Sequence, residues 1–501
     1  MGLSIGLDAQ VSGSVFRDFN ADGVKTNTAT FNEPFLPGII ITTYNAAGTV
    51  LASYTTIGAA YSIPAAGVYN GTLGSNTGGV PSGTAVRIEF TGLVTSDYSG
   101  PAGTANKSSI QFVTAPASNV IFGVNYPSDY CQLNPDLAVP CYVNGLRSGG
   151  APTVALLKSP YNSAGTAPTK TELGSKSEVG TTWGVAYARR TKILYSSAFL
   201  KRHSDLGPNG LGAIYQVANA NTAAPGNPTL LVNLTAQGIN VGTAGSRNLG
   251  AVSTPNHDQN VFGQIGKIGL GDLEISDDET TLWTVNLNLK TLVRIPIATP
   301  TAANIQSYSI TDPACTGGTY RPFGLKFYKG EVYVGVICDA NTSNDANLRA
   351  TIYRFNPVTA TFTSVLNFPL TYGKGPGFIG GNTSTGSCAQ NAFKNWNLWS
   401  DAFPTSCAQS PTFLLNPQPI LSDIEFDIDG SMIIGFMDRS GHQLGSNNYS
   451  TNTGSTTIYE VASSGDILRA YNNNGTFQLE KNVIAGPVNS GAANNQGPGN
   501  S

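Results

Sequence analysis

The stretch ILSDIEFDIDGSMIIGFMDRSGHQ, residues 420–443, with TTIYEVASSGDILRAY, residues 456–471, sets the pattern for most of this chain. Apolar and acidic side chains alternate over residues 423–428, which is typical of a strand with one buried face. Asp429-Gly430 then predicts a tight hairpin, because glycine tolerates the positive φ that such turns require. The stretch therefore begins as two antiparallel strands joined by a short turn.

Three apolar runs complete this unit, at residues 432–437, 458–461 and 467–471, and together they predict a four-stranded meander. Similar units recur three times upstream at uneven spacing. Four-stranded units repeated in this way predict a β-propeller, with long loops inside some blades. The upstream copies begin with strand pairs at residues 183–199, 271–285 and 323–340, followed by single strands at residues 213–217, 229–234, 305–310, 351–355 and 361–368.

The composition agrees with an all-β chain and excludes several functions. Charged residues make up 11% of the 501 residues, less than half of the usual ~25%, and 58 residues are glycine. We find no convincing amphipathic helix. The net charge of −3 offers no basic surface for nucleic acid, and no apolar run approaches the ~20 residues of a membrane span.

Six cysteines fall into three pairs that are close in sequence. None of them has the CxxC spacing or a histidine at a metal-ligand spacing, so zinc is not expected. We interpret them as three disulfides formed in an oxidising, extracytoplasmic compartment, although six cysteines allow 15 pairings and free thiols are the alternative. The expected pairs are Cys131 with Cys141, Cys315 with Cys338, and Cys388 with Cys407.

A calcium loop is predicted in VSGSVFRDFNADGVKTNTATFNEPFLPGI, residues 11–39. Side chains at alternate loop positions converge on one point when a glycine at the sixth position allows a sharp turn, and Ca²⁺ prefers such oxygen ligands. The alternative is an Asx-rich turn that binds no ion. The predicted ligands are the side chains of Asp18, Asn20, Asp22 and Glu33 and the backbone carbonyl of Val24.

The first 126 residues resemble the SdrD B-like and collagen-adhesin B-type domains of bacterial surface proteins. The resemblance rests on the first strand, the D-x-N-x-D-G loop, the glutamate after it and the PGI second strand. It implies a small Ig-like β-sandwich with bound calcium, although the inserted KTNTATF places Glu33 later than usual. Expected strands are residues 11–16, 39–44, 50–56, 86–90, 108–113 and 119–124.

A second resemblance covers the segment of residues 122–150. Together with residues 200–215 and 435–443, this segment is similar to large secreted bacterial proteins in which a SdrD B-like module precedes an uncharacterised propeller-like region. That family implies an extracellular or cell-surface location and no established reaction. We expect a sandwich over residues 1–126, a disulfide-containing linker over residues 127–150, and a β-propeller, complete or not, over residues 151–501.

Polar residues at the ends of the second strands form a candidate ligand site. In a propeller, corresponding strand ends cluster at one mouth of the central channel, where ligands commonly bind. The alternative is a polar rim with ion pairs between blades. Aligning the first strands also places Ala186, Glu274, Lys326 and Glu425 at one position. The predicted funnel consists of Arg202, His203, Asp339, Asp438, Arg439 and His442.

The chain contains no HExxH, GxSxG or P-loop motif, and no GxGxxG after a strand. A metal-dependent propeller hydrolase using Glu274, Asp423, Glu425 and His257 stays open as an alternative. Carboxylates that alternate with apolar residues are equally typical of solvated strand faces. We therefore expect a protein that is not an enzyme.

The expected function is that of a secreted or cell-surface structural or adhesion protein. Its calcium-stabilised sandwich would act as a spacer, and its propeller would bind other surface proteins, glycans or copies of itself. The first alternative is a self-assembling subunit of an extracellular fibre or surface layer, which low charge and abundant Gly, Asn and Thr would suit. The second alternative is the propeller hydrolase.

Overall fold

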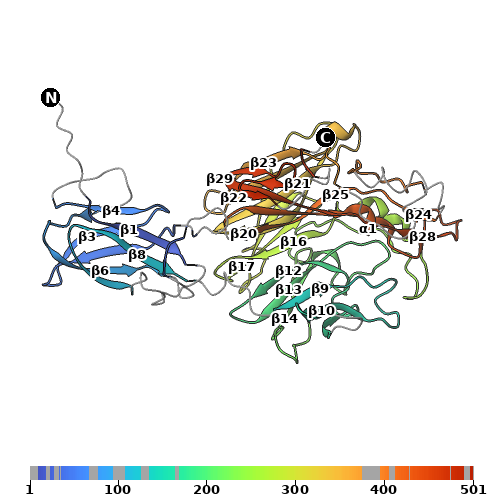
Figure 1. The fold of residues 1–501 in the computed structure, drawn as a ribbon. Coiled ribbons are helices and arrows are strands. Elements are labelled where there is room, and N and C mark those ends of the chain that lie inside the picture. The colour runs from blue at the N-terminus through green and yellow to red at the C-terminus, as the bar shows by residue number, and fades with distance from the viewer. Residues whose placement is uncertain are drawn as a thin grey trace. The chain divides into compact units, whose positions relative to one another are not determined.

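The computed structural model divides the chain into two compact units, Met1–Leu133 and Asn134–Ser501, which are described separately (Figure 1). Both are built almost entirely of strands, so the expected all-β class is confirmed. The structure describes residues 9–18, 23–26, 33, 35–66, 77–93, 108–125, 135–163, 169–374, 395–405, 412–427, 429–473, 475–489 and 497–499.

Two sheets form the first unit. In the smaller sheet, β1 (Ala9–Arg17) lies between β4 (Tyr61–Pro64), which is antiparallel to it, and β8 (Ala117–Val124), which is parallel. The larger sheet has the order β5-β3-β2-β6-β7. All six expected strands are present, and β4 and β5 are additional. The larger sheet comprises β2 (Ile40–Tyr44), β3 (Val50–Thr55), β5 (Thr77–Gly78), β6 (Ala85–Thr91) and β7 (Ile110–Thr114).

The core of the first unit lies between these two sheets. Val11 and Phe122 of the smaller sheet and Ile41 and Phe90 of the larger sheet belong to one buried cluster. The rings of Phe90 and Phe122 stack with centroids 4.6 Å apart. Burial alternates along β2 and β6, which is the physical reason that the alternating sequence pattern predicts strands here. The first unit is therefore a two-sheet sandwich.

The second unit begins with a three-stranded sheet of order β11-β10-β9. Its strand β9 (Asp136–Pro140) lies within the segment expected to be a linker and pairs antiparallel with β10 (Val154–Pro160). Strand β11 (Thr171–Ser175) pairs with the other edge of β10. The segment therefore contributes to the second unit.

Four four-stranded antiparallel sheets follow, as the repeated sequence unit predicts. In the first three, strands that are consecutive in sequence are also neighbours in the sheet. The first comprises β12 (Thr182–Ala188), β13 (Ile193–Ala198), β14 (Ala213–Val217) and β15 (Thr229–Asn233), and the second comprises β16 (Leu270–Ile275), β17 (Thr281–Asn286), β18 (Thr291–Pro296) and β19 (Gln306–Ser309).

The fourth of these sheets differs from the third by an insertion between its second and third strands, so its order is β25-β26-β29-β30. The third comprises β20 (Tyr320–Tyr328), β21 (Glu331–Cys338), β22 (Arg349–Asn356) and β23 (Thr361–Pro369), and the fourth comprises β25 (Pro419–Phe426), β26 (Met432–Asp438), β29 (Asp466–Asn473) and β30 (Thr476–Leu479).

The prediction that residues 458–461 supply the third strand of the last sheet is wrong. They form β28 (Ile458–Val461), which pairs with β24 (Phe413–Leu414) and β27 (Asn448–Tyr449) in a separate sheet. Strand β29 takes the expected place because its Leu468 and Ala470 are buried in the core, whereas Ile458 is 44% exposed.

The described residues also contain short elements that the sequence did not predict. The helix α1 (Arg439–Leu444) is capped at its N-terminus by Asp438, whose side chain accepts a hydrogen bond from the Ser440 backbone N–H. The remaining elements are the 3-10 turns η2 (Gly210–Gly212), η3 (Gln259–Gln264) and η4 (Asp345–Asn347) and the strands β31 (Ile484–Ala485) and β32 (Val488–Asn489).

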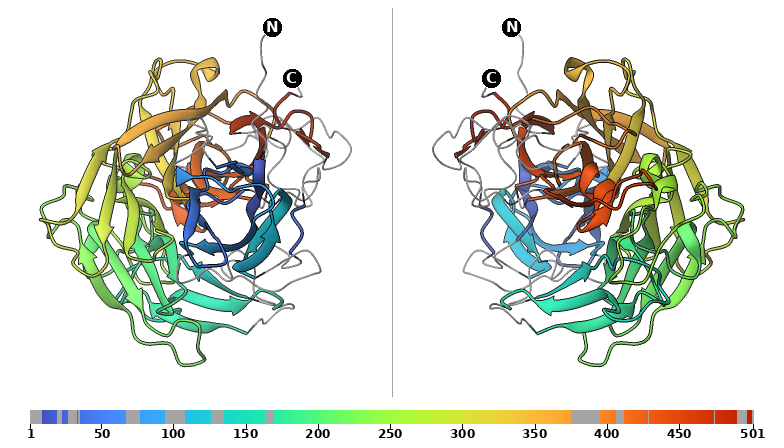
Figure 2. Two further views of the ribbon diagram at one scale, coloured as in Figure 1. Left: turned by 90° about the vertical axis from the view of Figure 1, so that its left-hand side faces the viewer. Right: turned by 90° about the vertical axis from the view of Figure 1, so that its right-hand side faces the viewer.

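The four-stranded sheets follow one another around an arc in chain order (Figure 2). Their first strands contact each other in sequence, β12 with β16, β16 with β20, and β20 with β25. Glycine permits this close approach. A Cβ added to Gly184 would lie 2.5 Å from the backbone nitrogen of Leu273, and one added to Gly324 would lie 2.7 Å from the backbone nitrogen of Asp423. This arrangement is that of propeller blades around an axis.

We expect the Gly324→Ala substitution to lower the free energy of unfolding of the second unit by about 2 kcal/mol, since the new methyl group meets backbone atoms of β25 that cannot rotate away. Denaturant unfolding would measure the change. Gly150→Ala is the matched control, because a Cβ at Gly150 meets nothing within 4 Å. Equal stabilities of the two variants would contradict this account of the blade contact.

Candidate functional site

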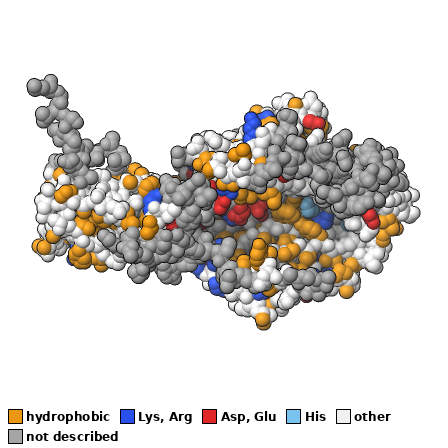
Figure 3. All heavy atoms as spheres, in the orientation of Figure 1, with side chains coloured by type: hydrophobic (Ala, Val, Ile, Leu, Met, Phe, Trp, Pro, Cys, Tyr) orange, Lys and Arg blue, Asp and Glu red, His pale blue; other side chains and the backbone are white. Residues whose placement is uncertain are grey.

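Charged side chains from three successive blades meet at the first strands. The Lys326 ammonium of β20 lies 2.6 Å from Glu425 Oε1 on β25 and 3.5 Å from Glu274 Oε1 on β16. Lys326 therefore contacts both of the glutamates that the sequence alignment places at the same position in their first strands. Figure 3 shows acidic side chains gathered in the hollowed face of the second unit.

Two further carboxylates belong to this cluster. Asp272 Oδ2 accepts a hydrogen bond from the Leu325 backbone N–H at 3.1 Å, and Asp423 Oδ1 accepts one from the Ile424 N–H at 2.7 Å. Burial, with the charge of Asp423 adding to it, raises the pKa of Asp272 well above its usual value. Burial and the neighbouring Glu425 raise the pKa of Asp423 to about 6.

The pKa of Glu274 is raised to about 7, mainly by burial and also by Glu425 and Asp423, while Lys326 opposes the shift. The folded protein therefore binds this proton more tightly than the unfolded chain does. The resulting stability is present below the unfolded value of 4.5 and is lost as the pH rises through about 7.

We expect the Glu274→Gln variant to be more stable than the wild type at pH 8 by roughly 2 kcal/mol, and no more stable at pH 5. The reason is that glutamine removes the buried negative charge that the wild type acquires between these pH values. Thermal unfolding at both pH values would measure the difference. Glu460→Gln serves as a control on an exposed glutamate. Equal pH dependence of wild type and Glu274→Gln would refute the expectation.

The six funnel residues are buried, with exposed fractions between 0% and 8%. The Arg202 guanidinium donates hydrogen bonds to the backbone carbonyls of His257, Gln443 and Tyr449. Arg202 thus joins its own segment to His257 and to residues 443–449. These hydrogen bonds hold the Arg202 side chain in place.

Arg439, the first residue of α1, makes a similar set of contacts. Its side chain donates to the carbonyl oxygens of Ile265, Ser400 and Gly263, and to side-chain oxygens of Gln418 and Asp401. It also lies against the Trp399 ring, with Cζ 4.3 Å from the ring centroid.

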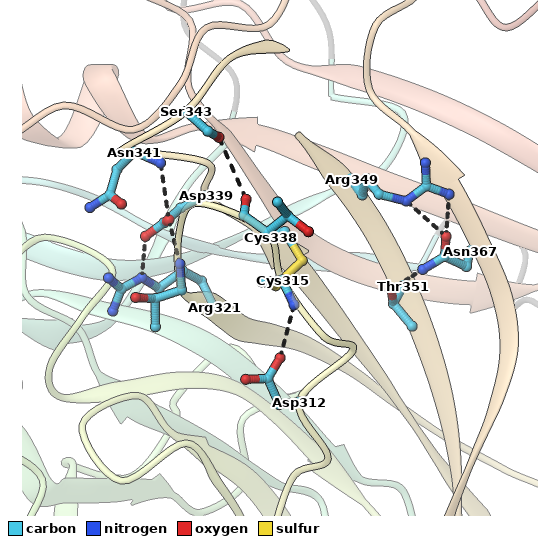
Figure 4. Close-up of a disulfide and its surroundings, with 12 residues drawn as sticks. Asp312, Cys315, Arg321, Cys338, Asp339, Asn341, Ser343, Arg349, Thr351 and Asn367 are labelled. Carbon is cyan, nitrogen blue, oxygen red and sulfur yellow. Dashed lines mark hydrogen bonds and ion pairs between the residues drawn. A yellow bond between two sulfur atoms is a disulfide. The ribbon is translucent and has the colours of Figure 1, made fainter. Parts of the chain in front are cut away.

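The two aspartates of the predicted funnel accept hydrogen bonds from backbone and side-chain donors. Asp438 accepts from the backbone N–H groups of Gln418, Ser440 and Ser464. Asp339 accepts from the Thr319 N–H at 2.7 Å and from Arg321 Nε at 2.8 Å (Figure 4). Asp339, Asp438 and Arg439 therefore hold strand ends in place and do not line the pocket described next.

Arg202, His203 and His442 do line a pocket, together with their sequence neighbours and residues from two other segments. Its volume is about 420 Å³. Histidine and basic side chains are visible in the hollowed face of the second unit (Figure 3). The lining comprises Tyr142, Asn144, Lys201, Arg202, His203, Ser204, Gly441, His442, Gly445, Ser446, Asn448, Val461 and Ser463.

Both histidines in the pocket are neutral at physiological pH. Burial lowers the pKa of each well below 6.5, and the nearby charge of Arg202 lowers that of His203 further. His203 Nδ1 lies 2.7 Å from Asn256 Oδ1. The His442 ring packs edge-on against the rings of Phe199 and Tyr142, with centroids 5.1 Å and 5.7 Å away.

The backbone of His203 is held in the left-handed region at φ 70°, which non-glycine residues rarely adopt. Its N–H donates to Asp258 Oδ2 at 2.9 Å, and its carbonyl accepts from the Gly145 N–H at 2.8 Å. These two contacts stabilise the unusual conformation. Strained residues held in this way are concentrated at functional sites.

Part of the predicted calcium loop lies in the described residues. Asp18 and Glu33 are buried, with 2% and 0% exposure. Asp18 Oδ2 accepts from the Gly23 N–H at 2.8 Å, and Glu33 Oε2 accepts from the Thr26 N–H at 2.7 Å. Val24 is 44% exposed. Asn20 and Asp22 lie outside the described residues.

One expected disulfide, Cys315–Cys338, is present, with Cα atoms 5.4 Å apart (Figure 4). Cys141 is half-buried and forms no disulfide with any residue that the structure describes. Its expected partner Cys131, and both Cys388 and Cys407, lie outside the described residues.

The residues of the hydrolase alternative lie in two places. Glu274, Asp423 and Glu425 belong to the carboxylate cluster. His257 Nδ1 instead contacts the Ser450 carbonyl at 2.8 Å, and its ring packs against Tyr449. Sequence reasoning missed Tyr142, Lys201 and Ser463 as pocket residues, because they lie in irregular segments without periodic pattern.

No family model matches the chain. The chain is similar to four colossins of Dictyostelium discoideum, three of which are described next. Colossin-B is 26% identical over 519 residues, covering 99% of this chain and 12% of Colossin-B. Colossin-A is 28% identical over 453 residues, covering 86% of this chain and 4% of Colossin-A. Colossin-D is 25% identical over 456 residues, covering 88% of this chain and 44% of Colossin-D. The chain thus spans a minor part of each relative.

Similarities to solved structures are remote. A nidogen/laminin complex gives a TM-score of 0.28 at 7% identity, covering 61% of this chain and 74% of that chain. An endo-1,4-beta-xylanase from Bacteroides thetaiotaomicron gives 0.31 at 11% identity, covering 69% and 94%. No conclusion about function follows from these values. Among the described residues, no helix is long and apolar enough to cross a membrane.

Proposed function

We propose that this chain is a secreted or cell-surface protein that is not an enzyme. In this proposal the second unit binds extracellular molecules, and the first unit is a calcium-stabilised spacer. The observation that carries the proposal is the pocket of about 420 Å³ beside the second-strand ends, whose neighbouring charged groups Arg202 and Arg439 are engaged in structural hydrogen bonds.

The extracellular location is supported by the Cys315–Cys338 disulfide, since disulfides persist mainly in oxidising compartments. The similarity to three colossins is compatible with this location. The similarity to SdrD B-like domains stays part of the proposal, and it rests on the sequence of the first 126 residues.

The absence of catalysis is supported by the contacts of the carboxylate cluster. Glu274 and Glu425 flank Lys326, and Asp272 accepts hydrogen bonds from the backbone N–H groups of Leu273 and Leu325. Turnover assays with ester, lactone and glycoside substrates test this point. Hydrolysis that Glu274→Gln abolishes while the protein stays folded would replace this proposal with the hydrolase alternative.

Calcium binding is supported by the chemistry of the described loop residues. Asp18 and Glu33 place two buried carboxylates beside the short segment of residues 23–26, which hydrogen-bonds to both. Carboxylates are among the oxygen ligands that Ca²⁺ prefers. Bound calcium would supply a divalent charge that holds the loop against the sandwich.

The calcium assignment is tested by thermal unfolding of the full chain in calcium and in excess chelator. At a free calcium concentration 100 times Kd, the expected stabilisation is about 2.7 kcal/mol. The Asp18→Asn variant should lose this response, whereas Asp312→Asn, on an exposed aspartate of the second unit, should keep it. Identical unfolding curves with and without calcium would contradict the assignment.

Binding by the second unit is tested with an array of neutral and acidic glycans and with sedimentation of the protein alone. Saturable binding by dispersed monomers supports the proposal. Ordered polymers without glycan binding would instead favour a self-assembling subunit of a fibre or surface layer.

A further inference from the structure

The charge around the pocket is unbalanced in favour of cations. The Lys201 ammonium donates to the Gly441 carbonyl at 3.0 Å and forms no ion pair among the residues that the structure describes. Arg202 bonds to carbonyl oxygens, and the nearby Asp258 carboxylate is bound by Arg247. No aspartate or glutamate lines the pocket. A negatively charged ligand would reduce this excess of positive charge.

Lys201 is therefore the group that selects the charge of the ligand. It lies beside the aromatic wall, with Nζ 5.2 Å from the centroid of the Tyr142 ring. Burial and the charge of Arg202 lower the pKa of Lys201 to about 8, so the side chain is mainly protonated at pH 7. A desolvated ammonium with only a carbonyl partner gains more from a carboxylate than a solvated lysine does.

A buried imidazole nitrogen in the pocket lining also lacks a partner. His442 Nδ1 has no hydrogen-bond partner among the described residues. An unpaired buried nitrogen costs free energy unless a ligand satisfies it. The His203 ring, in contrast, hydrogen-bonds to the Asn256 side chain and to the Leu444 backbone. His442 Nδ1 thus suits a hydroxyl group of the ligand.

The rest of the lining suits a small polyhydroxylated molecule. Ser446 and Ser463 provide hydroxyl groups, and Tyr142 provides an aromatic ring with a hydroxyl group. A ligand amine would find no carboxylate in this lining, which disfavours amino acids and other zwitterions. A doubly charged phosphate would find one available ammonium, since the Arg202 guanidinium is already engaged.

We propose that this pocket binds a sugar that carries one carboxylate, such as a hexuronate residue of an acidic glycan, with the carboxylate on Lys201 and a hydroxyl group on His442 Nδ1. This inference rests on the proposed function and adds the ligand class. The pocket volume of about 420 Å³ accommodates a unit of this size at the end of a longer chain.

The test is titration calorimetry of the full chain with a glucuronate disaccharide, and with the matching neutral glucose disaccharide. We expect the acidic sugar to bind at least tenfold more tightly at pH 7, because the charge-assisted hydrogen bond to Lys201 is absent with the neutral sugar. The preference should shrink above pH 8, as Lys201 loses its proton. Equal affinities for the two sugars at pH 7 would overturn the inference.

The Lys201→Met variant should lose the preference and its pH dependence while keeping weak binding of the neutral sugar. Lys170→Met, at an exposed lysine, should behave as the wild type. If Lys201→Met fails to fold, Ser463→Ala replaces it and should weaken binding of both sugars alike. Array binding to acidic glycans that Lys201→Met leaves unchanged would overturn the inference and leave the proposed function standing. No binding of any glycan would overturn both.

Discussion

The Arg439→Ala variant is expected to lose about 4 kcal/mol of the free energy of unfolding of the second unit, the largest effect among the substitutions considered. The Arg439 side chain is fully buried, and its donors reach Ile265, Ser400 and Gln418, which belong to three segments distant in sequence. Alanine would leave these oxygens buried without their donors and would open a cavity beside Trp399. Both effects add to the cost.

The matched variant Arg439→Lys separates the contribution of the positive charge to stability from that of the guanidinium geometry. Lysine keeps the positive charge but cannot reproduce the fork of the guanidinium, so we expect an intermediate loss of about 2 kcal/mol. Arg190→Ala, at an exposed arginine, should stay within about 0.5 kcal/mol of the wild type. Denaturant unfolding followed by tryptophan fluorescence suits this measurement, because Trp399 lies against Arg439. A loss below 1 kcal/mol for Arg439→Ala would show that the loops do not depend on this side chain.

Removal of the Cys315–Cys338 disulfide is expected to cost about 3 kcal/mol. The bond closes a loop with a sequence separation of 23, and a loop of this length loses roughly that much chain entropy in the unfolded state when it is closed. The bond ties the segment before β20 to the end of β21. There Asp339 accepts hydrogen bonds from Thr319 and Arg321 (Figure 4).

The single variants Cys315→Ala and Cys338→Ala and the double variant form a cycle that isolates the bond. Each single substitution breaks the same disulfide. The free energy of unfolding of the double variant should therefore be no lower than that of the less stable single variant. Losses that add in the double variant would mean that packing of the two side chains, rather than the bond, accounts for the effect. Unfolding should be measured without reductant, so that other cysteines keep their state.

Strand pattern and blade order could be predicted from the sequence, because they depend on interactions between neighbours in the chain. Alternating residues such as those of β25 bury one side of a strand, and a short turn brings the next strand alongside. The placement of Glu274, Lys326 and Glu425 at one position followed from the same logic. Each of these residues lies at the equivalent position in the first strand of its blade, and the first strands of successive blades are neighbours.

The third strand of the last blade could not be predicted in this way. Residues 458–461 and 466–473 both have the composition of a strand, and only Leu468 and Ala470 of the second segment fit the core left by β26. Packing between residues distant in sequence determines which segment becomes the third strand. Such packing leaves no periodic pattern in the local sequence.

The character of the site was also decided by tertiary structure. The sequence by itself determined that polar residues, among them Arg202, His203 and Arg439, follow the second strands, because these strands must end where apolar residues stop. Whether such a residue faces solvent, a ligand or a carbonyl oxygen depends on which loops surround it. The fold placed Arg202 and Arg439 among backbone carbonyls and left Lys201 without a carboxylate partner in the described structure, since burial makes every unpaired polar group costly.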